Sequence, residues 1–165
     1  MKISYPFNVT NDDGSVLPAT KAYLNINCSS YALEKEHADK LGVPRALKGT
    51  PLFKLLLEKC ESVKWAYTVH RELYVTPENY GSHEVPHSIA AGNMPVFCAG
   101  IAKCNSGSVT VDNWTGHYRV AGVRAEEDIR LAWAGCGVDV HLGSMINNSS
   151  SSEQPGQSNA GATKP

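Results

Sequence analysis

The segment from Trp114 to Tyr118 carries the densest set of chemically useful side chains in the sequence. It places an indole, a hydroxyl, an imidazole and a phenol within five consecutive residues, directly after an expected strand. Polar groups at the end of a strand are typical of ligand pockets, and an imidazole can transfer protons near pH 7. The competing interpretation is a surface turn, in which Gly116 permits the bend and the two aromatic rings pack on the sheet.

A second histidine-containing motif, His83-Glu84-Val85-Pro86-His87, fits the HExxH pattern of zinc peptidases. That chemistry needs a regular helix, which stacks the two imidazoles on one face. Pro86 would cost such a helix about 3 kcal/mol and disfavours helical geometry at Val85. The match is therefore interpreted as a coincidence, and no metal site is expected.

The cysteines leave one further kind of chemistry open. The five thiols form an odd set without a CxxC pair, which argues against a disulfide framework and a zinc knuckle, and the spacing of zinc deaminases is absent. Reduced, mostly buried thiols are the simplest expectation. A Cys-His amidase or deaminase remains an alternative, because Cys28, Cys98 or Cys136 could approach His87 or His117 in space.

Two helices are predicted before the first strand. Ser29 and Ser30 precede a run in which Leu33, His37 and Leu41 recur at helical spacing, and Gly42 follows as a left-handed cap. The second helix begins with Thr50 as N-cap and Pro51 in the first turn, and it ends near Cys60. Both helices are expected to be amphipathic.

Period-two patterns after Cys60 predict a sheet built from hairpins. Residues 63–69 alternate in polarity and are followed by a second run at 72–75, which predicts one hairpin, and 76–86 is expected to be a loop. A clearer hairpin joins 95–102 to 108–112, with Gly107 in the turn. A helix at 125–134 and a last short strand at 138–142 complete the expected elements.

These elements predict an α+β domain with a small antiparallel sheet, two helices before it and one after its main hairpins. The domain is expected to span residues 21–144. Residues 1–20 are interpreted as an N-terminal arm, and 145–165 as a disordered polar tail whose small side chains cannot offset the entropy of ordering.

The bulk composition narrows the classes of partner. Fifteen basic and 16 acidic residues give a formal net charge of −1, so generic binding to nucleic acid or to a membrane surface is not expected. The N-terminus lacks the apolar core of a Sec signal peptide. The expectation is a soluble protein that is cytoplasmic or delivered by a specialised secretion system.

Six motifs in order resemble the conserved domain of plant IQ-motif calmodulin-binding (IQM) proteins and similar C-terminal modules of bacterial Rhs-type polymorphic proteins. The resemblance covers roughly residues 60 to 142. The segments that carry it are Lys64–Val69, Arg71–Val75, His87-Ser88 with Ala91-Gly92, Ala99-Gly100, Trp114–Tyr118 and Val138–Val140.

The resemblance implies a shared pocket more than it implies a reaction. The family's His-Ser element falls on His87 and Ser88, and its Ser-Gly-His-Tyr element on 115–118. The chain departs from the family in three places: Ile89 stands where a second Ser is typical, Thr115 replaces Ser, and Val120 replaces Pro. The IQ helix is absent, so calmodulin binding is not carried over.

The leading functional hypothesis is an enzyme-like effector or toxin domain acting on a small polar ligand or a host protein, with ADP-ribosyl transfer as one candidate reaction and NAD as a candidate substrate. In that reaction His87 would hold the ribose, Tyr118 or Tyr74 would stack on the nicotinamide, and Glu72 or Glu84 would orient the acceptor. The predicted catalytic residues are His87, His117 and Tyr118, and the predicted substrate-binding residues are Ser88, Thr115, Gly116, Trp114 and Glu72.

A non-catalytic module that binds a ligand or a protein is the alternative. In it the same residues are structural, and His87 and His117 donate hydrogen bonds to backbone carbonyls. The Cys-His amidase or deaminase is the third possibility.

Overall fold

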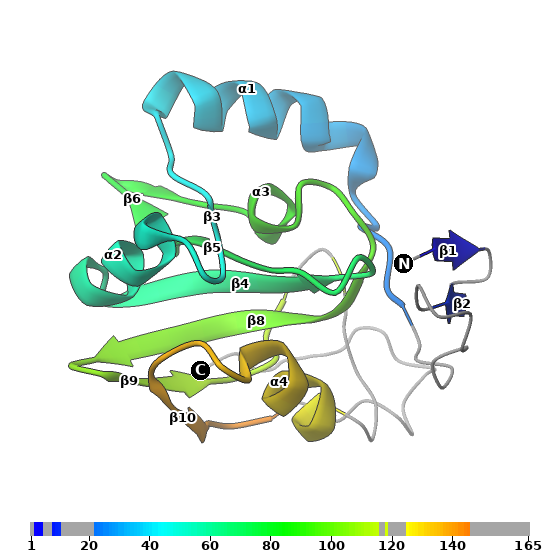
Figure 1. Ribbon diagram of the computed structural model, residues 1–165. Helices are drawn as coiled ribbons and strands as arrows, with labels where there is room; N and C mark the ends of the chain where they lie inside the picture. The colour runs from blue at the N-terminus through cyan, green and yellow to red at the C-terminus, as the bar shows by residue number, and fades with distance from the viewer. Residues whose placement is uncertain (1, 5–7, 11–21, 116–117, 119–124, 146–165) are drawn as a thin grey trace.

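The computed structural model describes residues 2–4, 8–10, 22–115, 118 and 125–145. Within these residues, six strands form the central sheet in the order β10-β9-β8-β4-β5-β3, and four α-helices lie on its two sides, with α1 packed on α3 (Figure 1). The elements are β1 (Lys2–Ser4), β2 (Asn8–Thr10), a 3-10 turn η1 (Cys28–Ser30), α1 (Tyr31–Leu41), β3 (Ala46–Leu47), α2 (Pro51–Lys59), β4 (Ser62–Thr68), β5 (Leu73–Pro77), β6 (Asn79–Tyr80), β7 (His83–Glu84), α3 (His87–Ala91), β8 (Val96–Asn105), β9 (Ser108–Val111), α4 (Ala125–Trp133) and β10 (Asp139–Leu142).

The predicted α+β class is confirmed, but the sheet is mixed. All paired neighbours in the central sheet run antiparallel except β9 and β10, which are parallel. The parallel pairing follows from α4, because a helix between two adjacent strands returns the chain to the edge from which it started. The last strand therefore extends the sheet beyond the hairpins.

The two N-terminal helices begin and end where the sequence predicts. Gly42 caps α1 with a φ of 75°, and the hydroxyl of Thr50 accepts a hydrogen bond from the Phe53 backbone at the start of α2. The predicted face of α1 is wrong. Leu33 is 72% exposed and Ala38 is the buried residue, because α1 packs on α3 and not on the sheet.

The β4–β5 hairpin forms as predicted, but β4 is buried on both faces and not on one. The Trp65 ring lies 6.0 Å from the Trp133 ring of α4, and the charge of Asp128 on the same helix acts on Tyr67. Lys64 and the other even-numbered residues point to the opposite side, where α3 packs. Helices cover both faces, so alternating polarity here does not mark a solvent-exposed face.

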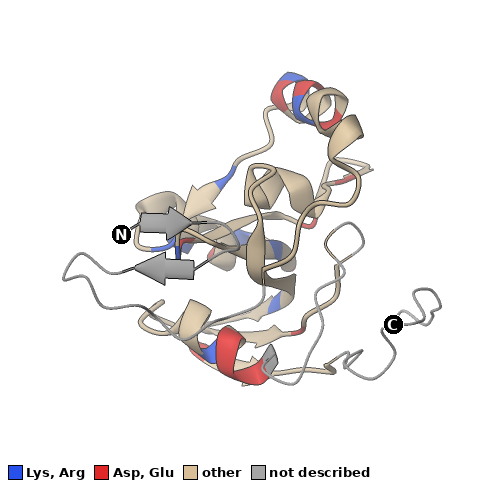
Figure 2. Cartoon of the chain, turned by 90° about the vertical axis from the view of Figure 1, so that its right-hand side faces the viewer, with Lys and Arg blue, Asp and Glu red and all other residues tan. Residues whose placement is uncertain are grey.

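The β8–β9 hairpin forms as predicted, but β8 continues to Asn105, three residues beyond its predicted end. Gly107 has a φ of 86° in the turn, and α4 ends before Gly135, which has a φ of 70°. The acidic first turn of α4, residues 126–128, stands out in red in Figure 2. Carboxylates at this end of a helix interact favourably with the helix dipole.

The segment predicted as a loop, 76–86, contains regular structure. β5 continues to Pro77, and β6 and β7 form a small ladder around Gly81. It leads into α3, a short helix that the sequence analysis missed. Extended Pro86 precedes α3 and left-handed Gly92 ends it. Five residues are too few to show helical periodicity. The sequence signal for α3 was therefore limited to Pro86 before the helix and Gly92 after it.

The predicted arm and tail fall largely outside the described residues. Within 1–20, β1 pairs with β2 in a separate two-stranded sheet. Met145, the first residue of the predicted tail, packs against the core, and 146–165 lie outside the described residues. In the described part of the chain, no helix is long and apolar enough to cross a bilayer.

Candidate functional site

The two faces of the central sheet differ in chemistry. The side that faces α2 and α4 holds an aromatic core, in which Phe53, Trp65 and Trp133 pack together. The side beside α3, called the α3 face here, buries polar side chains. These are Lys64, Thr68, Thr76, His87 and Ser88. Buried polar groups cost stability unless they are paired, so this polar side of the sheet is the candidate site.

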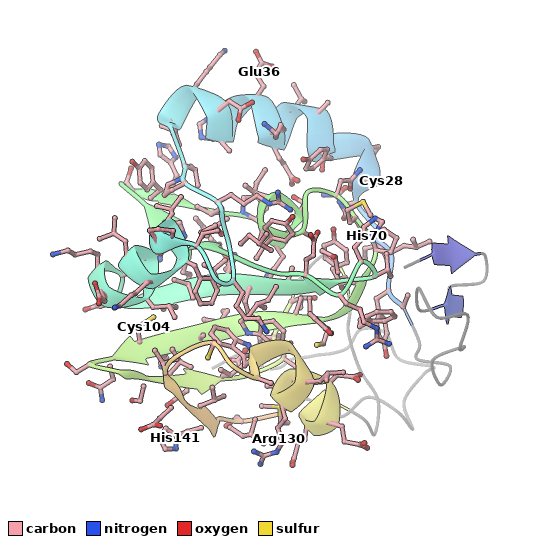
Figure 3. All side chains as sticks on the ribbon, in the orientation of Figure 1. Cys28, Glu36, His70, Cys104, Arg130 and His141 are labelled. Atoms are coloured by element: carbon pink, nitrogen blue, oxygen red, sulfur yellow. The ribbon has the colours of Figure 1, made fainter. Side chains whose placement is uncertain are left out.

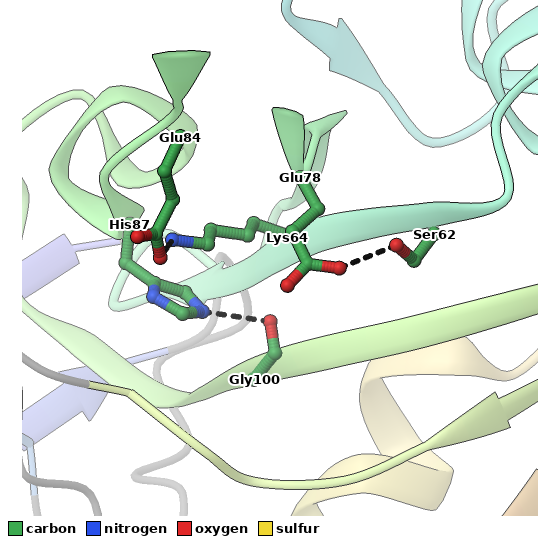
Figure 4. Close-up of polar contacts among 6 residues, drawn as sticks. All are labelled: Ser62, Lys64, Glu78, Glu84, His87 and Gly100. Carbon is green, nitrogen blue, oxygen red and sulfur yellow. Dashed lines mark hydrogen bonds and ion pairs between the residues drawn. The ribbon is translucent and has the colours of Figure 1, made fainter. Parts of the chain in front are cut away.

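His87 begins α3 and is held by the neighbouring strand. Its Nε2 atom lies 2.8 Å from the carbonyl oxygen of Gly100 in β8 (Figure 4). A carbonyl oxygen only accepts hydrogen bonds, so Nε2 carries the proton and donates. The buried imidazole is thereby fixed in orientation, and its second nitrogen is the one with basic character in the neutral ring.

Ser88 connects α3 to α1. Its hydroxyl donates to the Glu34 carboxylate over 2.6 Å, and the hydroxyl of Ser30 also lies 3.3 Å from that carboxylate. A small apolar cluster of Ala38, Val85 and Ile89 holds the two helices together. Sequence analysis missed Glu34, because Leu33 was expected to point inward. Ala38, four residues after Glu34 on the same helical face, was the sequence signal for the inward face of α1.

Lys64 and Glu84 form an ion pair at the boundary between the α3 face and solvent. Nζ lies 2.6 Å from a carboxylate oxygen of Glu84, and the two side chains are 5% and 70% exposed (Figure 4). Thr76 lies directly opposite Lys64 on β5, and no described residue hydrogen-bonds its buried hydroxyl. Two residues further along the same face, the Ser62 hydroxyl donates to Glu78, which follows β5.

Gly100 brings the Trp114 segment against the same strand. Asp112 directly follows β9, and one oxygen of its carboxylate accepts hydrogen bonds from the backbone N–H groups of Ile101 and Trp114, both at 2.9 Å. The Asp112 carbonyl oxygen lies 1.9 Å from the point where a Cβ on Gly100 would stand. Glycine is therefore required for this close approach.

Tyr118 is buried, and no described residue hydrogen-bonds its phenol oxygen. Burial raises the pKa of Tyr118 well above its usual value, Tyr31 and Glu34 raise it further, and Arg45 lowers it. Glu34 and Arg45 both bond to α3, through Ser88 and the carbonyl of Ala90. The charges that act on the phenol therefore belong to residues that also bond to α3.

The remaining predicted residues are placed only in part. Glu72 accepts a hydrogen bond from the Tyr74 hydroxyl at 3.0 Å, and the Arg45 guanidinium lies over the Tyr74 ring, 3.6 Å from its centre. Trp114 and Thr115 are partly buried, and Thr115 accepts a hydrogen bond from the Tyr118 backbone. Gly116 and His117 lie outside the described residues.

The thiols differ sharply in environment. Burial, with a smaller contribution from Asp128, raises the pKa of Cys98 well above its usual value. Cys98 pairs with Tyr67 and faces α4, so the sheet lies between this thiol and α3. Burial and nearby Cys60 raise the pKa of Cys104 to about 11. Cys28 is exposed, and it lies far from Cys104 (Figure 3). Cys98 is therefore a poor nucleophile for the His87 imidazole.

The helix that an HExxH zinc site needs does not form. His83 lies in β7 and His87 begins α3, with extended Pro86 between them. Among the described residues, no three His, Cys, Asp or Glu side chains are grouped as a metal site requires.

Comparison with known proteins adds no relative. No family model, no curated protein and no solved structure matches this chain. The geometry of the α3 face is therefore the basis for any functional proposal.

Proposed function

We propose that this chain is an enzyme-like effector domain that binds a polar, nucleotide-type ligand at the α3 face and transfers part of it. ADP-ribosyl transfer from NAD is the reaction that its residues suit best. A resemblance to the IQM domain and to Rhs-type modules supports an effector role. Calmodulin binding is not part of the proposal, because the IQ motif is absent.

The observation that carries the proposal is the phenol of Tyr118. A buried hydroxyl without a hydrogen bond costs about 1–3 kcal/mol, so a hydrophobic ring of the same shape would be at least as stable. Stability of the fold therefore does not explain why this position has a tyrosine and not a phenylalanine. A ligand that accepts or donates a hydrogen bond at this position would use it.

The neighbouring groups suit the transfer. In the proposed reaction the bond between nicotinamide nitrogen and ribose C1′ breaks, and nicotinamide leaves with the electron pair. The acceptor nucleophile then bonds to C1′, and its proton passes to a carboxylate. Glu84 is suited to take that proton because its carboxylate is exposed beside the α3 face. His87, fixed by Gly100, would hold the ribose.

The proposed partners are a small polar ligand and a host protein as acceptor. The site has a buried cation at Lys64 and an exposed carboxylate at Glu84, which is consistent with a ligand that carries both charge and polar groups. The proposed location is the cytoplasm, or a host cell reached through a specialised secretion system.

The experiment is to incubate the purified chain with a cell lysate, with and without NAD, and to search protein and RNA for adducts by mass spectrometry. The proposal expects NAD-dependent adducts with the wild type and a loss of about tenfold or more with Tyr118→Phe. Tyr80→Phe is the matched control, because Tyr80 is exposed in β6. Adducts that form equally with Tyr118→Phe would contradict the assigned role of Tyr118.

A non-catalytic binding module is the second candidate function. It is favoured by one observation, the hydrogen bond from buried His87 to a backbone carbonyl, which is the structural role that this candidate requires. It predicts that ADP-ribose or NAD binds the wild-type chain without any product. Nicotinamide release in the same sample distinguishes the two candidates.

A further inference from the structure

Lys64 is a cation in the interior of the sheet, where stability alone does not call for one. Its side chain is 5% exposed and lies on the α3 face between the small or polar residues of β4 and β5. A buried ion pair is often no more stabilising than apolar residues of the same volume. Stability alone therefore does not account for an ammonium at this position.

The partner of Lys64 is well placed to be exchanged. Glu84 is 70% exposed and belongs to β7, a strand of two residues in a small ladder with β6. When its carboxylate turns away it returns to water and is not left buried. The ammonium, by contrast, stays in the interior and then needs another anion.

Thr76, the cross-strand neighbour of Lys64, supplies a second, independent feature. It faces Lys64 directly across β4 and β5, and side chains paired in this way have Cβ atoms about 5 Å apart. No described residue bonds its buried hydroxyl. A buried hydroxyl that the protein leaves unpaired is available to an oxygen-rich ligand group.

We propose that Lys64 and Thr76 anchor a phosphate or pyrophosphate group and that Glu84 occupies the Lys64 ammonium until such an anion displaces it. The inference rests on the proposed function, because it places the phosphates of the nucleotide-type ligand. His87 lies three residues after Glu84, so the ribose next to those phosphates reaches the imidazole that Gly100 orients.

A second carboxylate limits the affinity of this site. Glu78 accepts a hydrogen bond from Ser62 two residues further along the same face from Lys64 and Thr76, and its negative charge repels a phosphate. Pyrophosphate alone is therefore expected to bind weakly, with a dissociation constant on the order of millimolar. The nucleoside part of the full ligand provides the remaining contacts.

The test is calorimetric titration of the full chain with pyrophosphate and, separately, with ADP-ribose. Glu84→Gln removes the competing carboxylate and is expected to tighten pyrophosphate binding about threefold or more. Thr76→Val is expected to weaken it about threefold, and Lys64→Met about tenfold or more. Lys64→Met keeps the apolar stem and leaves Glu84 in water, so the variant should fold. Lys54→Met, which changes an exposed lysine of α2, is the control.

Thermal unfolding gives a second measurement on the same proteins. Glu84→Gln leaves the buried ammonium without its carboxylate, so pyrophosphate should raise the melting temperature of this variant more than that of the wild type. Equal pyrophosphate binding by Lys64→Met and the wild type would overturn the inference, as would weaker binding by Glu84→Gln.

The outcomes separate this inference from the proposed function. If ADP-ribose binds the wild type and Lys64→Met equally, the inference about the phosphate anchor is wrong, but the proposed function is not contradicted. Pyrophosphate binding that depends on Lys64, with no NAD-dependent product in the lysate, supports the anchor and removes the transferase.

Discussion

The imidazole of His87 donates a hydrogen bond to the carbonyl of Gly100 over 2.8 Å, and this contact joins two motifs that lie far apart in the sequence. The carbonyl oxygen of Asp112, just before the Trp114 segment, packs against the same glycine in the space that a Cβ would fill. Gly100 is therefore the point at which α3 and the end of β9 meet on β8. The proposed ligand site depends on this meeting point.

Replacement of His87 by Ala is expected to destabilise the protein. The change removes a buried ring and its hydrogen bond to Gly100, which together should cost about 1–3 kcal/mol. Urea unfolding measures the loss. His87→Gln retains an N–H donor and should cost less, and an unchanged unfolding midpoint in His87→Ala would show that the imidazole does not hold α3.

Replacement of Gly100 by Ala is expected to cost more than replacement of a glycine that has open space around it. A Cβ would stand 1.9 Å from the Asp112 carbonyl oxygen, so the backbone must move. The expected loss exceeds about 3 kcal/mol. Gly49→Ala is the comparison, because Gly49 has a φ of 93° and open space around it, so its cost is backbone strain of about 1–2 kcal/mol. Equal losses would argue against the close approach at Gly100.

Tyr118→Phe is expected to leave stability at pH 7 unchanged or raised, because the lost hydroxyl has no described protein partner. The folded protein holds the Tyr118 pKa above its unfolded value of 10.0. The unfolded chain therefore releases the proton first, and this residue's contribution to stability is complete below about pH 10 and falls at higher pH. Phe removes that part of the alkaline loss.

Urea unfolding at pH 8 and near pH 11 tests this expectation. Tyr67, Tyr74 and Cys104 also have raised pKa values and keep their own alkaline contributions in both proteins. The difference between wild type and variant therefore reports Tyr118. An identical fall of stability with pH in both proteins would contradict the burial of this phenol.

Iodoacetamide labelling at pH 8 should separate the thiols. Cys28 is exposed and should react readily, whereas Cys98 is fully buried with a pKa well above its usual value and should react only after unfolding. Peptide mass spectrometry identifies the labelled sites. Rapid labelling of native Cys98 would show that the thiol reaches solvent and would strengthen the Cys-His amidase alternative.

The parts of the fold that depend on local chemistry could be predicted from the sequence. Gly42 and Thr50 mark helix ends because each supplies a backbone conformation or a hydrogen bond at its own position, and Gly107 marks a hairpin for the same reason. The inward face of α1 could not be predicted in this way. It depends on α3, which is distant in sequence and too short to show a period.

The site was predicted in part for a similar reason. His87, Ser88 and Tyr118 belong to polar segments that stand out in the sequence, and the structure places all three in buried positions. Lys64 was missed because alternation made it look like the solvent side of a hairpin, and Thr76 was missed because it was assigned to the loop at 76–86. Their burial comes from α3, and Glu84 becomes a partner of Lys64 only through the turn between β6 and β7.

An amide NMR titration of the chain with NAD tests the central claim most directly, because it locates the ligand on the protein. A ligand at the α3 face should give its largest shifts in residues 84–91 and on Lys64, Thr76 and Tyr118, with small shifts on the aromatic side at α4. Shifts that gather on α4 or β10 and leave α3 unchanged, or no shifts at all, would contradict it.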